Sequence, residues 1–178
     1  MIIYCEGACY VPPEHRRKFA EKGLVAARYA YSVYYFGNNS LQPDRCVMSE
    51  LLTGDNNHAE FMGVVTVYRK YKYVHHIYSD WHAIPDIYLP EDFEWFGEYK
   101  PIRELNKRGK TPLVSSLIEK CQLDNFDLLC LKNLTVKLPT DEQCLHHRRH
   151  HELHKLLRNQ GKKDQIEFNQ IIKRNKWK

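Results

Sequence analysis

The stretch Asp55-Asn56-Asn57-His58-Ala59-Glu60-Phe61-Met62 decides the fold that we expect for this chain. Asp and Asn are preferred helix N-caps because their side-chain oxygens accept hydrogen bonds from the free backbone N–H groups of the first turn. We therefore expect Asp55 or Asn56 to cap a helix over residues 59–71. Glu60 then lies in the first turn of that helix, where its carboxylate has a defined direction.

Two further acidic residues belong to strand-like segments on either side of this helix. Alternation over residues 1–8 places Glu6 on one face of a strand, and residues 74–80 form a second strand candidate that ends in Asp80. Mg²⁺ binds few protein carboxylates and keeps coordination positions for water and phosphate. We therefore expect Glu6, Glu60 and Asp80 to hold a divalent cation together.

Each acid alone also has a simpler interpretation. Glu6 is compatible with an exposed edge strand, and Asp80 is compatible with a turn. Glu60 is stabilised at a helix start by the helix dipole, by about 0.3–1 kcal/mol. A charged residue in a central strand, however, is costly unless it is paired. The three acids together therefore favour the metal site.

The composition is that of an ordinary globular domain, with 43% hydrophobic and 28% charged residues in a chain of 178. The sequence contains neither an apolar run of about 18 residues, which a membrane span needs, nor the N-terminal pattern of a secretory signal. Six cysteines are spread without close pairing, which predicts mostly buried free thiols. We expect an intracellular protein of the cytoplasm or nucleus, with no membrane partner.

The formal net charge of +5 is unevenly distributed. Residues 145–178 contain ten Lys or Arg and three Asp or Glu, a net charge of +7, which leaves −2 for residues 1–144. Basic side chains supply the salt-dependent, sequence-independent part of nucleic-acid binding, although a solvated charged end explains this composition almost as well. We divide the chain into a domain over 1–160 and a basic C-terminal tail over 161–178.

The order of predicted elements indicates an α/β protein with a mixed sheet. A β-branched run at 64–67 favours strand locally, but the cap and the segment length favour helix there. Hairpin strands followed by alternating helices and strands place helices on both faces of the sheet, with the first and fourth strands as parallel neighbours at its centre. We expect strands over 1–8, 24–36, 46–52, 74–80 and 126–131, and a loop or short helix over 11–23. We expect helices over 59–71, 111–122 and 144–159. The last of these should end at Gly161 and be followed by a short basic helix.

This order of strands and acids resembles ribonuclease H of type 1. The first strand of that family ends in Asp-Gly, matched here by Glu6-Gly7. Its first helix opens with Asn-Asn, two residues and Glu, which Asn56 to Glu60 match. Its next strand ends in an Asp, matched by Asp80, and the acid of its last helix is replaced by His151 in His151-Glu152-Leu153. The resemblance covers residues 1 to about 158.

The resemblance implies a ribonuclease H-like fold, with a mixed five-stranded sheet in which three antiparallel strands are followed by parallel strands. It also implies an endonuclease that cleaves the RNA strand of RNA/DNA hybrids with two Mg²⁺ or Mn²⁺ ions. The implied catalytic and metal-binding residues are Glu6, Glu60, Asp80 and His151. The residues expected to contact nucleic acid are Asn56 and Asn57 at sugar edges, and Lys107, Arg108, Lys110, Arg148 and Arg149 at phosphates.

The chain departs from the family pattern at several of these positions. Glu6 is one methylene longer than the usual Asp, and the imidazole of His151 suits Mn²⁺ better than Mg²⁺. Trp81 follows Asp80 where a small polar residue is usual, and the loop after the fifth predicted strand lacks a Gly-His. An alternative is therefore a catalytically degenerate module of the same fold that binds nucleic acid or a protein partner. A nuclease of the same superfamily that acts on branched DNA is a third reading.

The last predicted helix also carries a histidine cluster. Five of the ten histidines lie between positions 146 and 154. Cys144, His147 and His151 follow the spacing i, i+3, i+7, which places three possible Zn²⁺ ligands on one helix face. A solvated basic helix explains the same residues, and we favour it because no second ligand pair is evident in the sequence.

Overall fold

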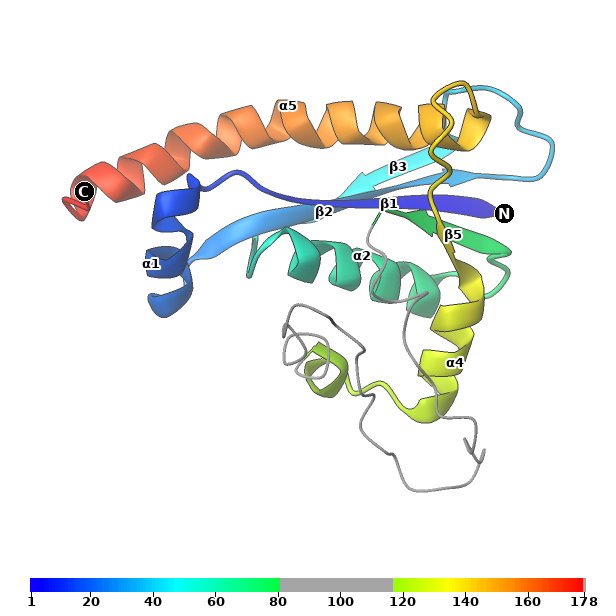
Figure 1. The fold of residues 1–178 in the computed structure, drawn as a ribbon, viewed down its shortest axis with the longest axis horizontal. Helices are drawn as coiled ribbons and strands as arrows, with labels where there is room; N and C mark the ends of the chain where they lie inside the picture. The colour runs from blue at the N-terminus through cyan, green and yellow to red at the C-terminus, as the bar shows by residue number, and fades with distance from the viewer. Residues whose placement is uncertain (81–116, 178) are drawn as a thin grey trace.

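The structure, a computed structural model, describes residues 1–80 and 117–177 (Figure 1). The predicted helix over 111–122 falls partly outside this range, and its described residues 117–120 are helical. Trp81 and the basic residues Lys107, Arg108 and Lys110 lie outside the described residues.

A mixed sheet forms the centre of the molecule. The strand order is β3-β2-β1-β5-β6, and β4 also pairs with β2. β1 pairs antiparallel with β2, and β2 with β3, whereas β1, β5 and β6 run parallel. The predicted α/β class, the mixed sheet and the parallel pairing of the first and fourth predicted strands are confirmed. The strands are β1 (Ile2–Cys9), β2 (Val25–Tyr34), β3 (Arg45–Met48), β4 (Leu52–Thr53), β5 (His76–Ser79) and β6 (Thr135–Lys137).

Helices cover both faces of this sheet, as predicted. α2 and α4 lie on one face and α5 crosses the other, reaching beyond the sheet toward α1 (Figure 1). A 3-10 turn, η1, leads directly into α1, so the segment 11–23 contains a short helix. The elements are η1 (Pro13–His15), α1 (Arg16–Glu21), α2 (Asn56–Lys70), α4 (Asn125–Leu134) and α5 (Leu145–Arg174).

The cap that opens α2 is Asp55 rather than Asn56. The Asp55 side chain accepts a hydrogen bond from the backbone N–H of His58 at 2.9 Å. The β-branched residues of this helix, among them Val64, Val65 and Val67, are buried. Packing against the sheet therefore outweighs their local strand preference, and the helix prediction is confirmed.

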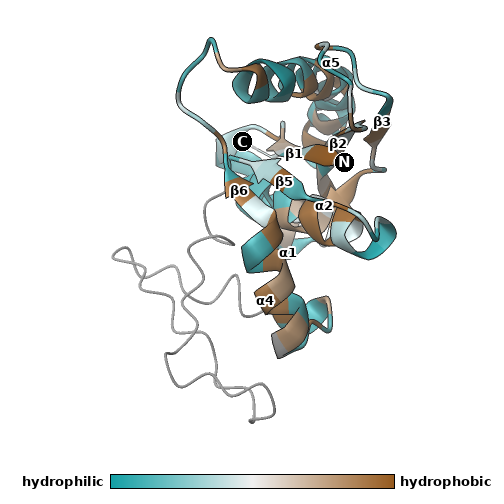
Figure 2. Cartoon of the chain, turned by 90° about the vertical axis from the view of Figure 1, so that its right-hand side faces the viewer, coloured by the Kyte–Doolittle hydropathy of each residue, from teal (hydrophilic) through white to brown (hydrophobic). Residues whose placement is uncertain are grey.

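Alternation along β1 divides the apolar residues between two cores. Ile3 and Cys5 belong to the core under α2, together with Phe61. Tyr4 belongs to the core under α5, together with Leu153. Because successive strand side chains point to opposite faces, Glu6 shares the α5 face with Tyr4. Figure 2 shows hydrophobic residues concentrated in the strands and in α2 and α4, and mixed with polar residues along α5.

Two strand predictions are wrong. Residues 126–131, predicted as the fifth strand, lie in α4, because Asp124 and Asp127 form a reciprocal capping box that starts a helix there. The last strand is instead the short β6. The predicted strand over 46–52 is divided into β3 and β4, both of which pair with β2, with an irregular register at β4.

The predicted helix end at Gly161 is also wrong, because α5 continues without a break to Arg174. A Cβ at position 161 would lie 2.1 Å from ring carbons of Tyr10. Gly161 therefore allows α5 to pack closely against the chain that follows β1. The residues set apart as a basic tail begin in the middle of this helix.

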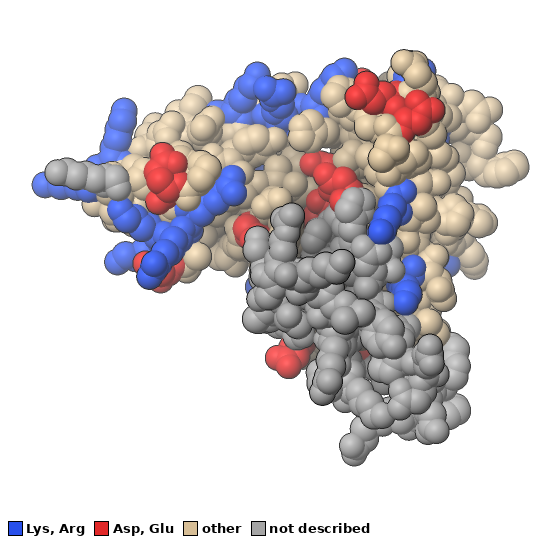
Figure 3. All heavy atoms as spheres, viewed as in Figure 1, with Lys and Arg blue, Asp and Glu red and all other residues tan. Residues whose placement is uncertain are grey.

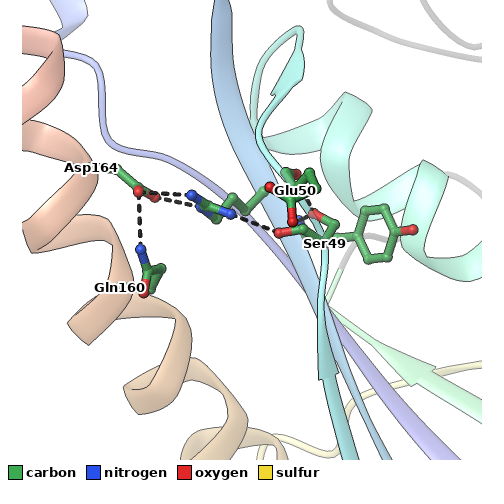
Figure 4. A network of polar contacts seen from close by, with 6 residues as sticks. Ser49, Glu50, Gln160 and Asp164 are labelled. Atoms are coloured by element: carbon green, nitrogen blue, oxygen red, sulfur yellow. Dashed lines mark hydrogen bonds and ion pairs between the residues drawn. The ribbon is translucent and has the colours of Figure 1, made fainter.

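A partly buried ion pair holds the second half of α5 to the sheet (Figure 4). The Arg28 guanidinium donates from Nε and Nη2 to the two carboxylate oxygens of Asp164, at 2.7 and 3.0 Å. Its Nη1 donates to the carbonyl of Ser49 at 2.8 Å, and Gln160 donates to Asp164 at 3.1 Å. These paired bonds fix the position of α5 relative to β2.

All six cysteines are free thiols, as predicted, but only Cys5 and Cys121 are buried, so the expectation that most of them are buried is wrong. Within the described ranges, no helix has the length and apolar character that crossing a membrane requires.

We predict that Gly161→Ala destabilises the protein by about 1–3 kcal/mol, because the new methyl group overlaps the Tyr10 ring. In a Tyr10→Ala background the same substitution should stabilise by about 0.5–1 kcal/mol, since Ala favours helix over Gly. Urea unfolding of the four variants, followed by far-UV circular dichroism, measures this coupling. Equal effects of Gly161→Ala in both backgrounds would contradict the contact.

Candidate metal centre

The three predicted acids come from three elements that meet beside β1. Glu6 lies in β1 and Asp80 directly after β5, whereas Glu60 lies in the second turn of α2 rather than in the first turn that the sequence predicts, because the helix begins at Asn56. A Cβ on Gly7 would lie 2.4 Å from the backbone nitrogen of Glu60. Only glycine allows α2 to approach β1 this closely, and this approach brings Glu60 beside Glu6.

Asp80 and His150 complete a ligand group with Glu6. One possible ligand atom from each of the three lies within 4.8 Å of the others. The carboxyl group of Glu60 interacts with that of Asp80 through a hydrogen bond and through charge, and it accepts a hydrogen bond from the Ser79 hydroxyl. The structure therefore brings Glu6, Glu60 and Asp80 together, as the sequence predicts.

The imidazoles that contact Glu6 are those of His150 and His154. His150 Nε2 lies 2.8 Å from Glu6 Oε2, and His154 Nδ1 lies 3.0 Å from Oε1. His151, the histidine taken from the sequence as a ligand, is exposed and stacks on His154 with ring centroids 6.5 Å apart. Because neighbouring helix residues are turned by about 100°, His150 faces the sheet where His151 does not.

Glu6 and His150 form a buried pair of opposite charge. Glu6 is 4% exposed and His150 is 6% exposed. Burial alone lowers the pKa of His150, but the hydrogen bond and charge of Glu6 outweigh it, so the pKa of His150 is raised. A raised pKa favours the cationic imidazolium beside the Glu6 carboxylate.

Glu60 has the opposite tendency, since its neighbours disfavour its charge. Burial raises the pKa of Glu60 well above its ordinary value, and the hydrogen bond and charge of Asp80 and the charge of Glu6 raise it further. The hydrogen bond from Ser79 acts in the other direction but is the smallest of these influences. Glu60 therefore favours its protonated form when no cation is bound.

The donor set fits a divalent cation. Glu6 Oε2 accepts no well-directed hydrogen bond from the described residues, although it is close to His150 Nε2. The same nitrogen lies 3.2 Å from the carbonyl of Cys5, so one proton on it is shared between the carbonyl and Glu6 Oε2. A buried carboxylate beside two further carboxyl groups is an environment that a divalent cation would stabilise. Glu6, Asp80 and His150 would hold it, with Glu60 next to them, and His150 would release its proton on binding because only the neutral imidazole is a metal ligand.

A surface hollow of about 390 Å³ gives access to this centre. Both predicted asparagines line it, so the structure places Asn56 and Asn57 beside the acids. Further lining residues include Glu6, Glu60, Asp80, Tyr10, Arg16 and His154.

Of the arginines predicted to contact phosphate, Arg148 and Arg149 are described, and neither is among the residues that line this hollow. Arg148 is exposed on α5. Arg149 is 3% exposed, and its guanidinium donates to the carbonyls of Asn38 and Ser40 at 2.5 and 2.9 Å while lying 3.9 Å above the Tyr34 ring. Arg149 therefore fastens the β2–β3 turn to α5.

The possible Zn²⁺ ligands on α5 do not converge. His147 is within hydrogen-bond distance of the carbonyl of Pro139, at 3.0 Å, and His151 is exposed. In the described part of the chain, no group of neighbouring metal ligands contains Cys144, His147 or His151.

No family model and no curated protein matches the sequence, and no solved structure matches the fold.

We predict that the metal-free protein loses stability as the pH rises from about 4.5 through the raised pKa of Glu60, because folding then requires an unfavourable buried charge. Glu60→Gln should reduce this slope of unfolding free energy by up to about 1.4 kcal/mol per pH unit, the value for one proton. Urea unfolding with EDTA between about pH 5 and about pH 8 measures the slope.

The exposed variant Glu142→Gln is the matched control for this measurement and should leave the slope unchanged. A slope that is the same in the native chain and in Glu60→Gln would show that Glu60 ionises normally.

Proposed function

We propose that this chain is a metal-dependent endonuclease with a ribonuclease H-like fold, which cleaves the RNA strand of RNA/DNA hybrids. The observation that carries the proposal is the convergence of Glu6, Glu60 and Asp80 in one hollow that Asn56 and Asn57 also line. These are the acids and amides on which the sequence resemblance rests, and they come from separate elements.

The strand arrangement supports the same assignment. Three antiparallel strands, β3, β2 and β1, are followed in the sheet by the parallel strands β5 and β6. The resemblance implies this arrangement and an acid on the central strand. Glu6 lies on β1, at the centre of the sheet, which agrees with that expectation.

The residues that would hold Mg²⁺ or Mn²⁺ are Glu6, Asp80 and His150, together with Glu60. Two such ions, when bound, lower the pKa of an attacking water and stabilise the leaving oxygen of a phosphodiester. His154 orients Glu6 through its contact with Oε1 at 3.0 Å. The imidazole of His150 in this set favours Mn²⁺ over Mg²⁺.

The side chains at the rim and on α5 suit a nucleic-acid substrate. The amides of Asn56 and Asn57 offer donors and acceptors to sugar edges, where the 2′-hydroxyl distinguishes RNA from DNA. On the face drawn in Figure 3, lysine and arginine side chains lie over α5 and around its C-terminal end with some acidic side chains among them, and further acidic side chains lie in the middle of the face. Basic side chains along α5 would attract the phosphate backbone.

One observation favours a second candidate, a catalytically degenerate module of the same fold that binds nucleic acid or a protein partner. Both carboxylate oxygens of Glu6 already lie within 3.0 Å of histidine nitrogens of α5. This buried acid therefore has imidazole partners without a metal, so the presence of an acid at this position does not by itself require catalysis.

We predict that Glu60→Gln and Asp80→Asn each reduce cleavage of a labelled RNA/DNA hybrid by more than about 100-fold, beyond the loss typical for residues that only support metal ligands. His150→Asn should reduce it comparably, whereas His151→Asn should stay within about threefold of the native rate, since its side chain is exposed. Single-turnover cleavage with Mg²⁺ and with Mn²⁺ measures these rates.

Native cleavage that survives Glu60→Gln would contradict the proposed metal centre. Binding of the hybrid without cleavage in either metal would support the binding module instead. The absence of both binding and cleavage would contradict the endonuclease and a module that binds the hybrid, and would leave a module with a different partner.

A further inference from the structure

An arginine lines the acidic hollow without being neutralised by its acids. Arg16 begins α1, directly after η1, and its side chain is exposed. Among the described residues, no carboxylate lies within ion-pair distance of Arg16, although Glu6, Glu60 and Asp80 line the same hollow.

Backbone carbonyls hold the Arg16 guanidinium in place. Its Nε donates to the carbonyl of Val11 at 3.1 Å, and its Nη2 donates to the carbonyl of Cys9 at 3.3 Å. Both carbonyls belong to the end of β1 and the residues that follow it. Of the five N–H donors of the guanidinium, two bond to these carbonyls, and no other described residue accepts a hydrogen bond from the remaining three.

We propose that Arg16 binds a backbone phosphate of the nucleic acid next to the metal centre, an inference that rests on the proposed function. The guanidinium fork matches the geometry of phosphate oxygens and forms charge-assisted hydrogen bonds with them. Because the carbonyls already fix its orientation, Arg16 loses little conformational freedom on binding. It supplies a positive charge at the rim of a hollow whose other charged groups are mainly acids.

The neighbouring Arg17 provides a matched control for this inference. Arg17 is 90% exposed, pairs with Glu21 at 2.7 Å and is not among the residues that line the hollow. Arg16→Gln and Arg17→Gln remove the same charge from adjacent positions. A difference between the two variants therefore reports the local contact rather than the overall charge of the protein.

The test is fluorescence anisotropy of a labelled RNA/DNA hybrid in Mg²⁺, with every protein in a Glu60→Gln background so that cleavage does not interfere. Binding is measured between about 50 and about 200 mM salt. Arg16→Gln should weaken binding about tenfold and reduce the slope of log K against log salt by about one unit. Arg17→Gln should stay within about twofold of the parent.

A purely structural role for Arg16 predicts a different pattern. If the side chain only braces the residues after β1, Arg16→Gln lowers the urea midpoint and weakens binding without changing the salt slope, which would overturn the proposal. Arg16→Lys keeps the charge and loses the fork, so it should restore the slope while leaving the affinity below that of the parent.

The outcome for Arg16 is separable from that for the endonuclease. Equal binding by the Arg16→Gln and Arg17→Gln variants overturns the phosphate contact even if the native chain cleaves the hybrid. Selective loss on Arg16→Gln supports the contact even if the native chain does not cleave. Failure of the parent to bind the hybrid overturns the contact.

Discussion

The pairing of Glu6 with His150 is the interaction on which the rest of the site depends. A carboxylate in the middle of a central strand, 4% exposed, is costly unless opposite charge and hydrogen bonds compensate for its lost hydration. α5 supplies that compensation from one face of the sheet. From the other side, Gly7 allows the start of α2 to come close enough to place Glu60 nearby. The acidic centre therefore exists because two helices on opposite faces are both fixed against β1.

The sequence predicts those parts of this arrangement that local chemistry determines. The Asp55 cap and the alternation along β1 are local signals, and they place Glu60 at a helix start and Glu6 on a strand face. The choice between His150 and His151 depends instead on which face of α5 meets the sheet. The buried residues Leu153 and Leu157 mark that face, and their spacing from His150 is helical. The helical spacing of these leucines in the sequence is therefore a signal that His150 and His154 face the sheet.

Other features depend on contacts between distant segments, which local patterns do not reveal. Glycine often ends a helix, but Gly161 lies inside α5 because Tyr10, remote in the sequence, occupies the space of a side chain. Arginine is a residue type that often binds phosphate, yet the guanidinium of Arg149 donates its hydrogen bonds to carbonyls of the β2–β3 turn. The strand predicted over 126–131 is wrong for a local reason, since the capping box of Asp124 and Asp127 starts a helix there.

The most direct test of the metal centre is electron paramagnetic resonance of Mn²⁺ added to the full chain, with detection of nitrogen nuclei coupled to the bound ion. If Glu6, Asp80 and His150 hold the cation, the native chain binds Mn²⁺ and shows coupling to an imidazole nitrogen. That coupling is lost in His150→Asn and kept in His151→Asn. Absence of bound Mn²⁺ in the native chain, or nitrogen coupling that His150→Asn leaves unchanged, would contradict this account of the site.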